Sequence, residues 1–225
     1  MGYFPFYIDI KDKKCIVIGG GKTALRKIKN LMPFEPDIEV ISPEILPEIS
    51  ETENIKIIRR EYRNGDIDDA FMVITATDNK SLNEKIFRLC TDKKILVNTV
   101  DDIEKCEFIF PSLVHRDDIS IGISTSGKSP VFSKFMRIII DDMLNDDYIE
   151  IFQILSRFRP YVKDMFDTEK QSREALESIL DFCLASDENI PSDDEIKDML
   201  ERIEKGYKMK LTKEIFREYD IRGIY

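Results

Sequence analysis

Several residue types are scarce in this 225-residue chain, and each shortage excludes a class of protein. The four cysteines, Cys15, Cys90, Cys106 and Cys183, are far apart and form no Cys-x-x-Cys pair, which excludes a zinc knuckle and a disulfide framework. We expect reduced thiols in a cytoplasmic protein. Because His115 is the only histidine, we predict no resident metal site and place His115 at the surface, in a hairpin turn.

An excess of basic charge and long apolar runs are also missing. The chain has 34 Lys and Arg against 44 Asp and Glu, and this net charge of −10 argues against nucleic acid, whose phosphates need a basic surface. No apolar run approaches the ~18 residues of a membrane span. Met1–Ile10 lacks the basic start and the apolar core of a signal peptide. We therefore expect neither a membrane nor a nucleic acid as partner.

Short apolar runs and helical patterns alternate in the first hundred residues. The predicted strands are Cys15–Ile18, Ile38–Ile41, Ile55–Ile58, Phe71–Thr75 and Ile95–Val97. The predicted helices are Lys22–Met32 and Ser81–Thr91, the second with Ser81 as its N-cap. This alternation predicts right-handed crossovers and an α/β, Rossmann-like parallel sheet, with ligands at the carboxyl ends of the strands.

The pattern changes after residue 98. Glu107–Thr125 predicts two strands joined by an Arg-Asp-Asp turn, a small β-hairpin outside the parallel sheet. The remaining chain is helical, with predicted helices at Pro130–Leu144, Tyr148–Met165, Glu169–Leu184, Asp193–Lys205 and Lys213–Tyr219. Composition makes Ser186–Asp194 the linker candidate.

The stretch CIVIGGGKTALRKIKNL, residues 15–31, carries a glycine turn between a strand and a helix. Gly19, Gly21 and Ala24 fit the pattern G-x-G-x-x-(G/A) in the position where it binds dinucleotides. One glycine makes the turn, one admits a pyrophosphate, and the alanine lets the helix pack closely. The pyrophosphate then lies on the helix N-terminus, whose free N–H groups favour anions. The alternative is a plain strand-to-helix turn.

The end of the second strand bears on the choice of cofactor. A typical NAD site has Asp or Glu there to bind the ribose hydroxyls, whereas Ser42, Pro43 and Glu44 follow Ile41. A serine hydroxyl or a backbone group can replace that acid. No arginine is present at this point to bind a 2′-phosphate, so we predict NAD rather than NADP.

The end of the fifth strand and one loop carry further candidates. The fifth strand is followed by Asn98, Asp101 and Asp102. A position beside the nicotinamide favours Asp101 over Asp102 as a functional acid. The alternative is that the two aspartates form a solvated turn. The loop STSGKSP, residues 124–130, combines three hydroxyls, a glycine and Lys128 with Ser129 as the N-cap of a helix. The loop is able to bind carboxylates, or it is an ordinary capped helix start.

The motifs PFYIDIKDKKCIVIGGGKTALRKIKNL, VITATDN, VNTVDD, FIFPSLVHR and ISTSGKSPVFSKFMR occur in order between Pro5 and Arg137. In these motifs the chain resembles the precorrin-2 dehydrogenase and sirohydrochlorin ferrochelatase family, the module also found at the N-terminus of siroheme synthase. The resemblance implies NAD-dependent oxidation of precorrin-2 to sirohydrochlorin by a cytoplasmic homodimer, with Fe²⁺ insertion in some members. One departure is Ser126, which stands where Gly or Asn is common.

The resemblance assigns roles to residues and to parts of the chain. It implies an NAD-binding Rossmann domain at 1–106, a dimerisation domain at 107–147 and a helical C-terminal region at 148–225. Asp101 matches the proposed catalytic aspartate. The expected NAD-binding residues are Gly19, Gly20, Gly21, Lys22, Thr23, Ala24, Ser42, Pro43, Glu44, Thr75, Ala76, Thr77 and Asp78. The expected substrate-binding residues are Asn98, Arg116, Ser124, Thr125, Ser126, Gly127 and Lys128.

Two other functions share the glycine turn. A non-catalytic NAD-sensing module would not account for the STSGKSP loop or for an acid at the nicotinamide end. An NAD-dependent dehydrogenase of a small metabolite predicts a tight, enclosed pocket instead of a broad cleft able to take a macrocycle.

Overall fold

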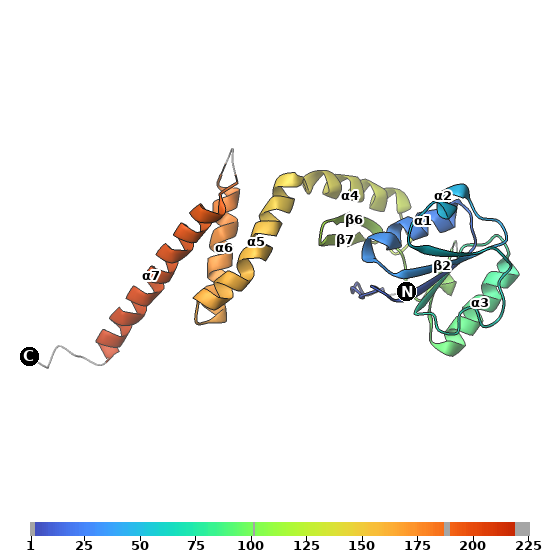
Figure 1. The fold of residues 1–225 in the computed structure, drawn as a ribbon, viewed down its shortest axis with the longest axis horizontal. Helices are drawn as coiled ribbons and strands as arrows, with labels where there is room; N and C mark the ends of the chain where they lie inside the picture. The colour runs from blue at the N-terminus through green and yellow to red at the C-terminus, as the bar shows by residue number, and fades with distance from the viewer. Residues whose placement is uncertain (1–2, 101, 187–189, 219–225) are drawn as a thin grey trace, which may run out of the picture. The chain divides into compact units, whose positions relative to one another are not determined.

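The computed structural model describes residues 3–100, 102–186 and 190–218 (Figure 1). The chain divides into two compact units, Met1–Ile138 and Ile139–Tyr225, and the boundary falls inside the helix α4 (Pro130–Met143). The three-part division expected from the sequence stays a prediction. In the part of the chain that the structure describes, no helix has the length and apolarity needed to cross a membrane.

The first unit contains a five-stranded parallel sheet, as predicted. Its strands are β1 (Lys14–Ile18), β2 (Asp37–Ile41), β3 (Ile55–Ile58), β4 (Met72–Thr75) and β5 (Leu96–Thr99), in the spatial order β3-β2-β1-β4-β5. The chain starts in the middle of the sheet and extends it first on one side and then on the other. The strand order therefore reverses beside β1, where an open α/β sheet offers a crevice at its carboxyl edge.

Helices cover both faces of the sheet. From Cys15 to Ile18, alternate residues of β1 point to opposite faces and all four are buried, which explains the continuous apolar run. On one face α1 (Lys22–Leu31) packs through Ala24 and Ile28, and on the other α3 (Lys80–Lys93) packs through Ile86 and Cys90. Shorter pieces are α2 (Pro47–Ser50), η1 (Met32–Phe34) and η2 (Ile103–Lys105).

The predicted N-cap of α3 is wrong by two residues. Asn79, not Ser81, caps the helix, because its extended backbone lets its side-chain oxygen accept from the Leu82 amide at 3.0 Å. Asparagine is as good an N-cap as serine, so composition alone did not distinguish them. The predicted cap of α4 is confirmed, since the Phe132 amide donates to the Ser129 hydroxyl at 3.3 Å.

The hairpin lies outside the parallel sheet, as predicted. Its strands β6 (Ser112–Arg116) and β7 (Ile119–Ile123) pair antiparallel around Asp117, which has a left-handed backbone. The placement of His115 in the turn is wrong, because this residue lies within β6 and is half-buried. Its Nδ1 is 2.9 Å from the hydroxyl of Ser120 across the hairpin, and its ring lies 4.8 Å from that of Phe34.

The second unit is built from helices α5 (Asp146–Met165), α6 (Glu169–Leu184) and α7 (Asp193–Glu218) around a separate apolar core. The prediction of two helices in the last segment is wrong, because α7 continues through Gly206. One helical glycine costs only about 1 kcal/mol relative to alanine and does not end a helix. Of the predicted linker 186–194, residues 187–189 lie outside the described residues, and Asp193 and Asp194 already belong to α7.

Candidate dinucleotide-binding site

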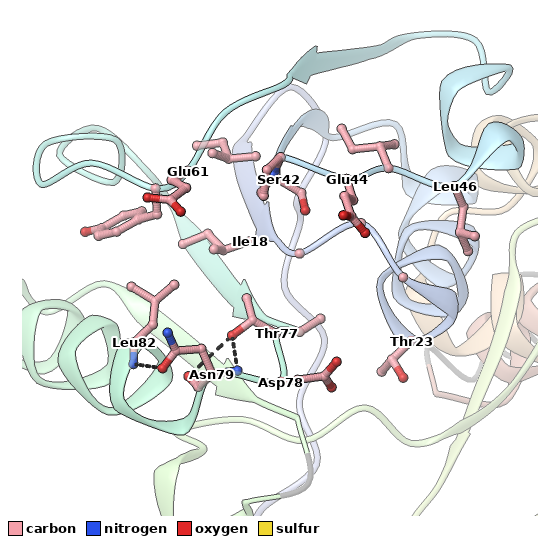
Figure 2. Close-up of a pocket in the computed structure, with 18 of the residues that line it drawn as sticks. Ile18, Thr23, Ser42, Glu44, Leu46, Glu61, Thr77, Asp78, Asn79 and Leu82 are labelled. Atoms are coloured by element: carbon pink, nitrogen blue, oxygen red, sulfur yellow. Dashed lines mark hydrogen bonds between the residues drawn. The ribbon is translucent and has the colours of Figure 1, made fainter.

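A pocket of about 790 Å³ lies at the carboxyl ends of β1, β2 and β4 (Figure 2). All but two of the residues predicted to bind NAD line it, namely Gly19, Gly20, Gly21, Lys22, Thr23, Ser42, Pro43, Glu44, Ala76, Thr77 and Asp78. The two exceptions, Ala24 and Thr75, are fully buried behind it. The fold thus gathers three separate sequence motifs into one site, while the role of each residue in binding stays a prediction.

The three glycines of the turn serve three different needs. Gly19 has φ of +119°, and a Cβ atom there would lie 2.2 Å from the carbonyl oxygen of Ala76. A Cβ atom on Gly20 would lie 2.2 Å from the carbonyl oxygen of Glu44. A Cβ atom on Gly21 would meet nothing within 4 Å, although this residue lines the pocket. Gly19 and Gly20 therefore let neighbouring loops approach, and Gly21 leaves room for a ligand.

The first turn of α1 lies at the pocket and has the features of an anion site. The N–H groups at the start of a helix have no partner within it, and Gly21 at the N-cap supplies no side chain to bind them. The first turn contains no acidic residue, and Lys22 and Thr23 line the pocket. Ala24 below them is small enough for α1 to pack directly on the sheet. This end of α1 fits a pyrophosphate, through free donors and the helix dipole.

The loop between β4 and α3 is fixed by a hydrogen-bonded pair. The Thr77 hydroxyl donates to Asn83 Oδ1 at 2.6 Å, and Asn83 Nδ2 donates back to the Thr77 carbonyl at 2.9 Å. The Ala76 amide donates to the Ile18 carbonyl at 2.7 Å, which ties this loop to β1. Asp78 is exposed at the pocket rim. The rim therefore has a defined shape before any ligand binds.

The loop after β3 contributes residues that the sequence reasoning missed. Glu61 and Tyr62 line the pocket, together with Ile18, Ile41 and Leu82. The ring of Tyr62 also packs against the core beneath α3, and burial raises the pKa of its hydroxyl to about 12. Glu61 and Tyr62 reach the pocket because β3 lies beside β2 in the sheet. Sequence composition does not reveal this order of strands.

The residues predicted to bind substrate do not line this pocket. Asp101 lies outside the described residues. Asn98 is buried at the end of β5, where its Nδ2 donates to the Phe108 carbonyl at 2.9 Å and holds the returning chain. Arg116 ends β6, and Ser124, Thr125, Ser126, Gly127 and Lys128 form the loop between β7 and α4. Ser126 and Gly127 have φ of 52° and 77°, which explains why Gly or Asn suits position 126.

The described residues hold no cluster of three His, Cys, Asp or Glu side chains suited to a metal ion. The pocket, by contrast, fits a dinucleotide on the observations above: an open glycine face, an uncapped helix start and apolar walls. The fold and the site define a nucleotide-binding Rossmann domain. Residues 6–112 match the family of putative NAD(P)-binding domains.

Comparison with known proteins extends this result. The chain is 36% identical over 177 residues to the siroheme synthase of Thioalkalivibrio sulfidiphilus, covering 77% of this chain and 36% of that protein. It is 34% identical over 188 residues to the siroheme synthase of Vesicomyosocius okutanii, covering 82% and 40%. The chain thus spans less than half the length of these curated relatives.

The fold is similar to the solved structure of SirC, precorrin-2 dehydrogenase, with a TM-score of 0.71 and 24% sequence identity. That similarity covers 90% of this chain and 100% of the other. These similarities confirm the resemblance to the precorrin-2 dehydrogenase and sirohydrochlorin ferrochelatase family that the motifs indicated.

Proposed function

We propose that this chain is an NAD-dependent dehydrogenase that oxidises precorrin-2 to sirohydrochlorin in siroheme biosynthesis. The observation that carries the proposal is the open face of Gly21 at the uncapped start of α1, which suits a dinucleotide pyrophosphate. Similarity to siroheme synthases and to a precorrin-2 dehydrogenase supports the choice of substrate. The cytoplasm is the proposed location.

The reaction removes two hydrogens from the macrocycle, one as a hydride and one as a proton. When bound, NAD⁺ supplies the hydride acceptor. The glycine turn and the first turn of α1 hold the pyrophosphate, and the segment Ser42–Glu44 lies along the adenosine ribose. Asp101 takes the proton as general base. Lys128 and Arg116, with the hydroxyls of the loop Ser124–Lys128, bind the carboxylates of the substrate.

A second reaction, insertion of Fe²⁺ into sirohydrochlorin, belongs to the same proposal with iron as a substrate. Metal insertion also removes protons, from the pyrrole nitrogens, so one base serves both reactions. Asp101 is the residue we assign to both.

The proposed enzyme is a homodimer. The hairpin has only two strands and is marginal by itself. Beside it in the sequence, α4 exposes four large apolar side chains in the first unit, Val131, Phe132, Phe135 and Ile138, each more than half exposed. A second copy of this chain would cover these residues.

The test is incubation of the purified chain with precorrin-2 and NAD⁺. We expect NADH and sirohydrochlorin to form in equal amounts, followed by absorbance, and Gly21→Asp to abolish both. Fe²⁺ uptake is measured separately, with sirohydrochlorin and no NAD⁺. Binding of NAD⁺ without any turnover of precorrin-2 would indicate a sensor or another dehydrogenase.

A further inference from the structure

The end of β3 leads into the same pocket as the end of β2. Ile41 and Ile58 are register partners in the sheet, and the Ser42 amide donates to the Ile58 carbonyl at 3.2 Å. Three residues beyond Ile58, Glu61 reaches the lining of the pocket, as Figure 2 shows beside Ser42. A typical NAD site has an acid at the end of β2. Here the neighbouring position is occupied by the carboxylate of Glu61, which comes from the loop after β3.

The two arginines in front of Glu61 are held away from the pocket. Arg60 makes two hydrogen bonds of 2.8 Å to the Asp66 carboxylate, and its charge and hydrogen bonds hold the pKa of that carboxyl below its usual range. Arg60 also donates to the Glu61 carbonyl at 3.0 Å, which fixes the backbone there. Arg59 donates to the Ser50 hydroxyl at 2.7 Å. Neither arginine lines the pocket among the described residues.

The carboxylate of Glu61 is itself exposed and makes no hydrogen bond or ion pair with a described residue. The adjacent Tyr62 is anchored in the core beneath α3, so the carboxylate is carried on a fixed segment. An ionised carboxylate only accepts hydrogen bonds, and a ribose 2′,3′-diol offers two donors. A 2′-phosphate in the same place would meet a like charge.

We propose that Glu61 is the residue that binds the adenosine ribose hydroxyls and selects NAD over NADP. This inference rests on the proposed function for its dinucleotide and adds a residue that determines cofactor specificity. Glu44 and Asp78 also line the pocket, and Glu44, which follows β2, is the acid that competes for this role. The Glu44 carbonyl packs against Gly20, so the backbone of Glu44 lies beside the glycine turn, whereas Glu61 comes from the loop beyond β3.

The experiment is calorimetric titration of the chain with NAD⁺ and with NADP⁺. Three matched variants are compared with the unmodified chain: Glu61→Gln, Glu44→Gln and Glu53→Gln, the last at an exposed position outside the pocket. We expect Glu61→Gln to weaken NAD⁺ binding and to strengthen NADP⁺ binding. The ratio of the two dissociation constants should change roughly 10- to 100-fold, as for a lost hydrogen bond to a charged group. Glu53→Gln should leave the ratio unchanged.

An unchanged ratio in Glu61→Gln, or a change that appears in Glu44→Gln instead, overturns the inference. The proposed function is tested separately, by measuring NADH formation from precorrin-2. If Glu61→Gln changes the binding ratio but the chain forms no NADH from precorrin-2, the role of Glu61 stands and the proposed substrate is wrong. If the chain binds neither NAD⁺ nor NADP⁺, both the role of Glu61 and the proposed function are wrong.

Discussion

Gly127 lies directly against Ile103, because a Cβ atom on residue 127 would stand 2.9 Å from Cδ1 of that isoleucine. The contact places the loop after β7 beside η2, the helical turn that follows β5. Gly127 has φ of +77°, so its backbone also favours glycine. The loop expected to bind substrate is therefore next to Ile103, which lies two positions along the sequence from Asp101.

The first prediction concerns capture of the anionic substrate by this loop. The chain has a net charge of −10, so a substrate with many carboxylates needs a local cation, and Lys128 is exposed in the loop. Lys128→Glu should raise the KM for precorrin-2 and leave NAD⁺ affinity unchanged, and added salt should reduce the difference. Lys85→Glu, at an exposed position of α3, is the control with the same charge change. The measurement is steady-state kinetics at two salt concentrations. Equal KM values for Lys128→Glu and Lys85→Glu would show that the loop is not part of the substrate site.

The second prediction separates binding from folding within the glycine turn. Gly21→Asp places a negative side chain in open space at the helix start, so the fold should persist while NAD⁺ affinity falls roughly 100-fold or more. Gly19→Ala should behave in the opposite way. It forces a Cβ atom against the Ala76 carbonyl at a positive φ, and the melting temperature should drop. Calorimetry and thermal melting measure both effects, and unimpaired NAD⁺ binding by Gly21→Asp would refute the assignment.

The strands, the glycine turn and the hairpin could be predicted because each depends on local sequence. β-branched runs form strands wherever they are buried, and the turn between β1 and α1 needs glycine at Gly19 for its own backbone. Glu61 could not be found in this way. Its place in the pocket depends on β3 lying beside β2, and sheet order is decided by contacts between distant segments. The same holds for His115, whose partners Phe34 and Ser120 come from other elements.

The third prediction tests the dimer through the exposed side of α4. Phe135 is 53% exposed in the single chain, beside Phe132 with ring centroids 6.2 Å apart. Burying one such ring contributes roughly 1.5–3 kcal/mol, and a buried charge in its place is costly. Phe135→Glu should therefore shift the chain from dimer to monomer at micromolar concentration, whereas Lys85→Glu should not. Sedimentation equilibrium gives the result; an unmodified chain that is already monomeric would end this proposal.

The last prediction is the role of Asp101, tested against its neighbour. The Asp102 carboxylate makes an ion pair of 2.7 Å with Lys105, which also pairs with Glu84 of α3 at 2.8 Å. Asp102 is thus engaged in holding η2 to α3. Asp101→Asn keeps the size of the side chain but removes the base, so NAD⁺ binding should persist while NADH formation slows by roughly 10²–10⁴-fold. Asp102→Asn should lower the melting temperature slightly and the rate much less.

Three measurements on both variants distinguish a base from a residue that only shapes the loop: NAD⁺ affinity, NADH formation from precorrin-2, and Fe²⁺ uptake by sirohydrochlorin. If Asp101 removes protons from the macrocycle in both reactions, Asp101→Asn depresses oxidation and iron uptake together and leaves NAD⁺ affinity intact. A rate near that of the unmodified chain would mean that the proton leaves to solvent or to another group. Equal losses in Asp101→Asn and Asp102→Asn would instead mean that the conformation of this segment, rather than one carboxylate, limits the reaction.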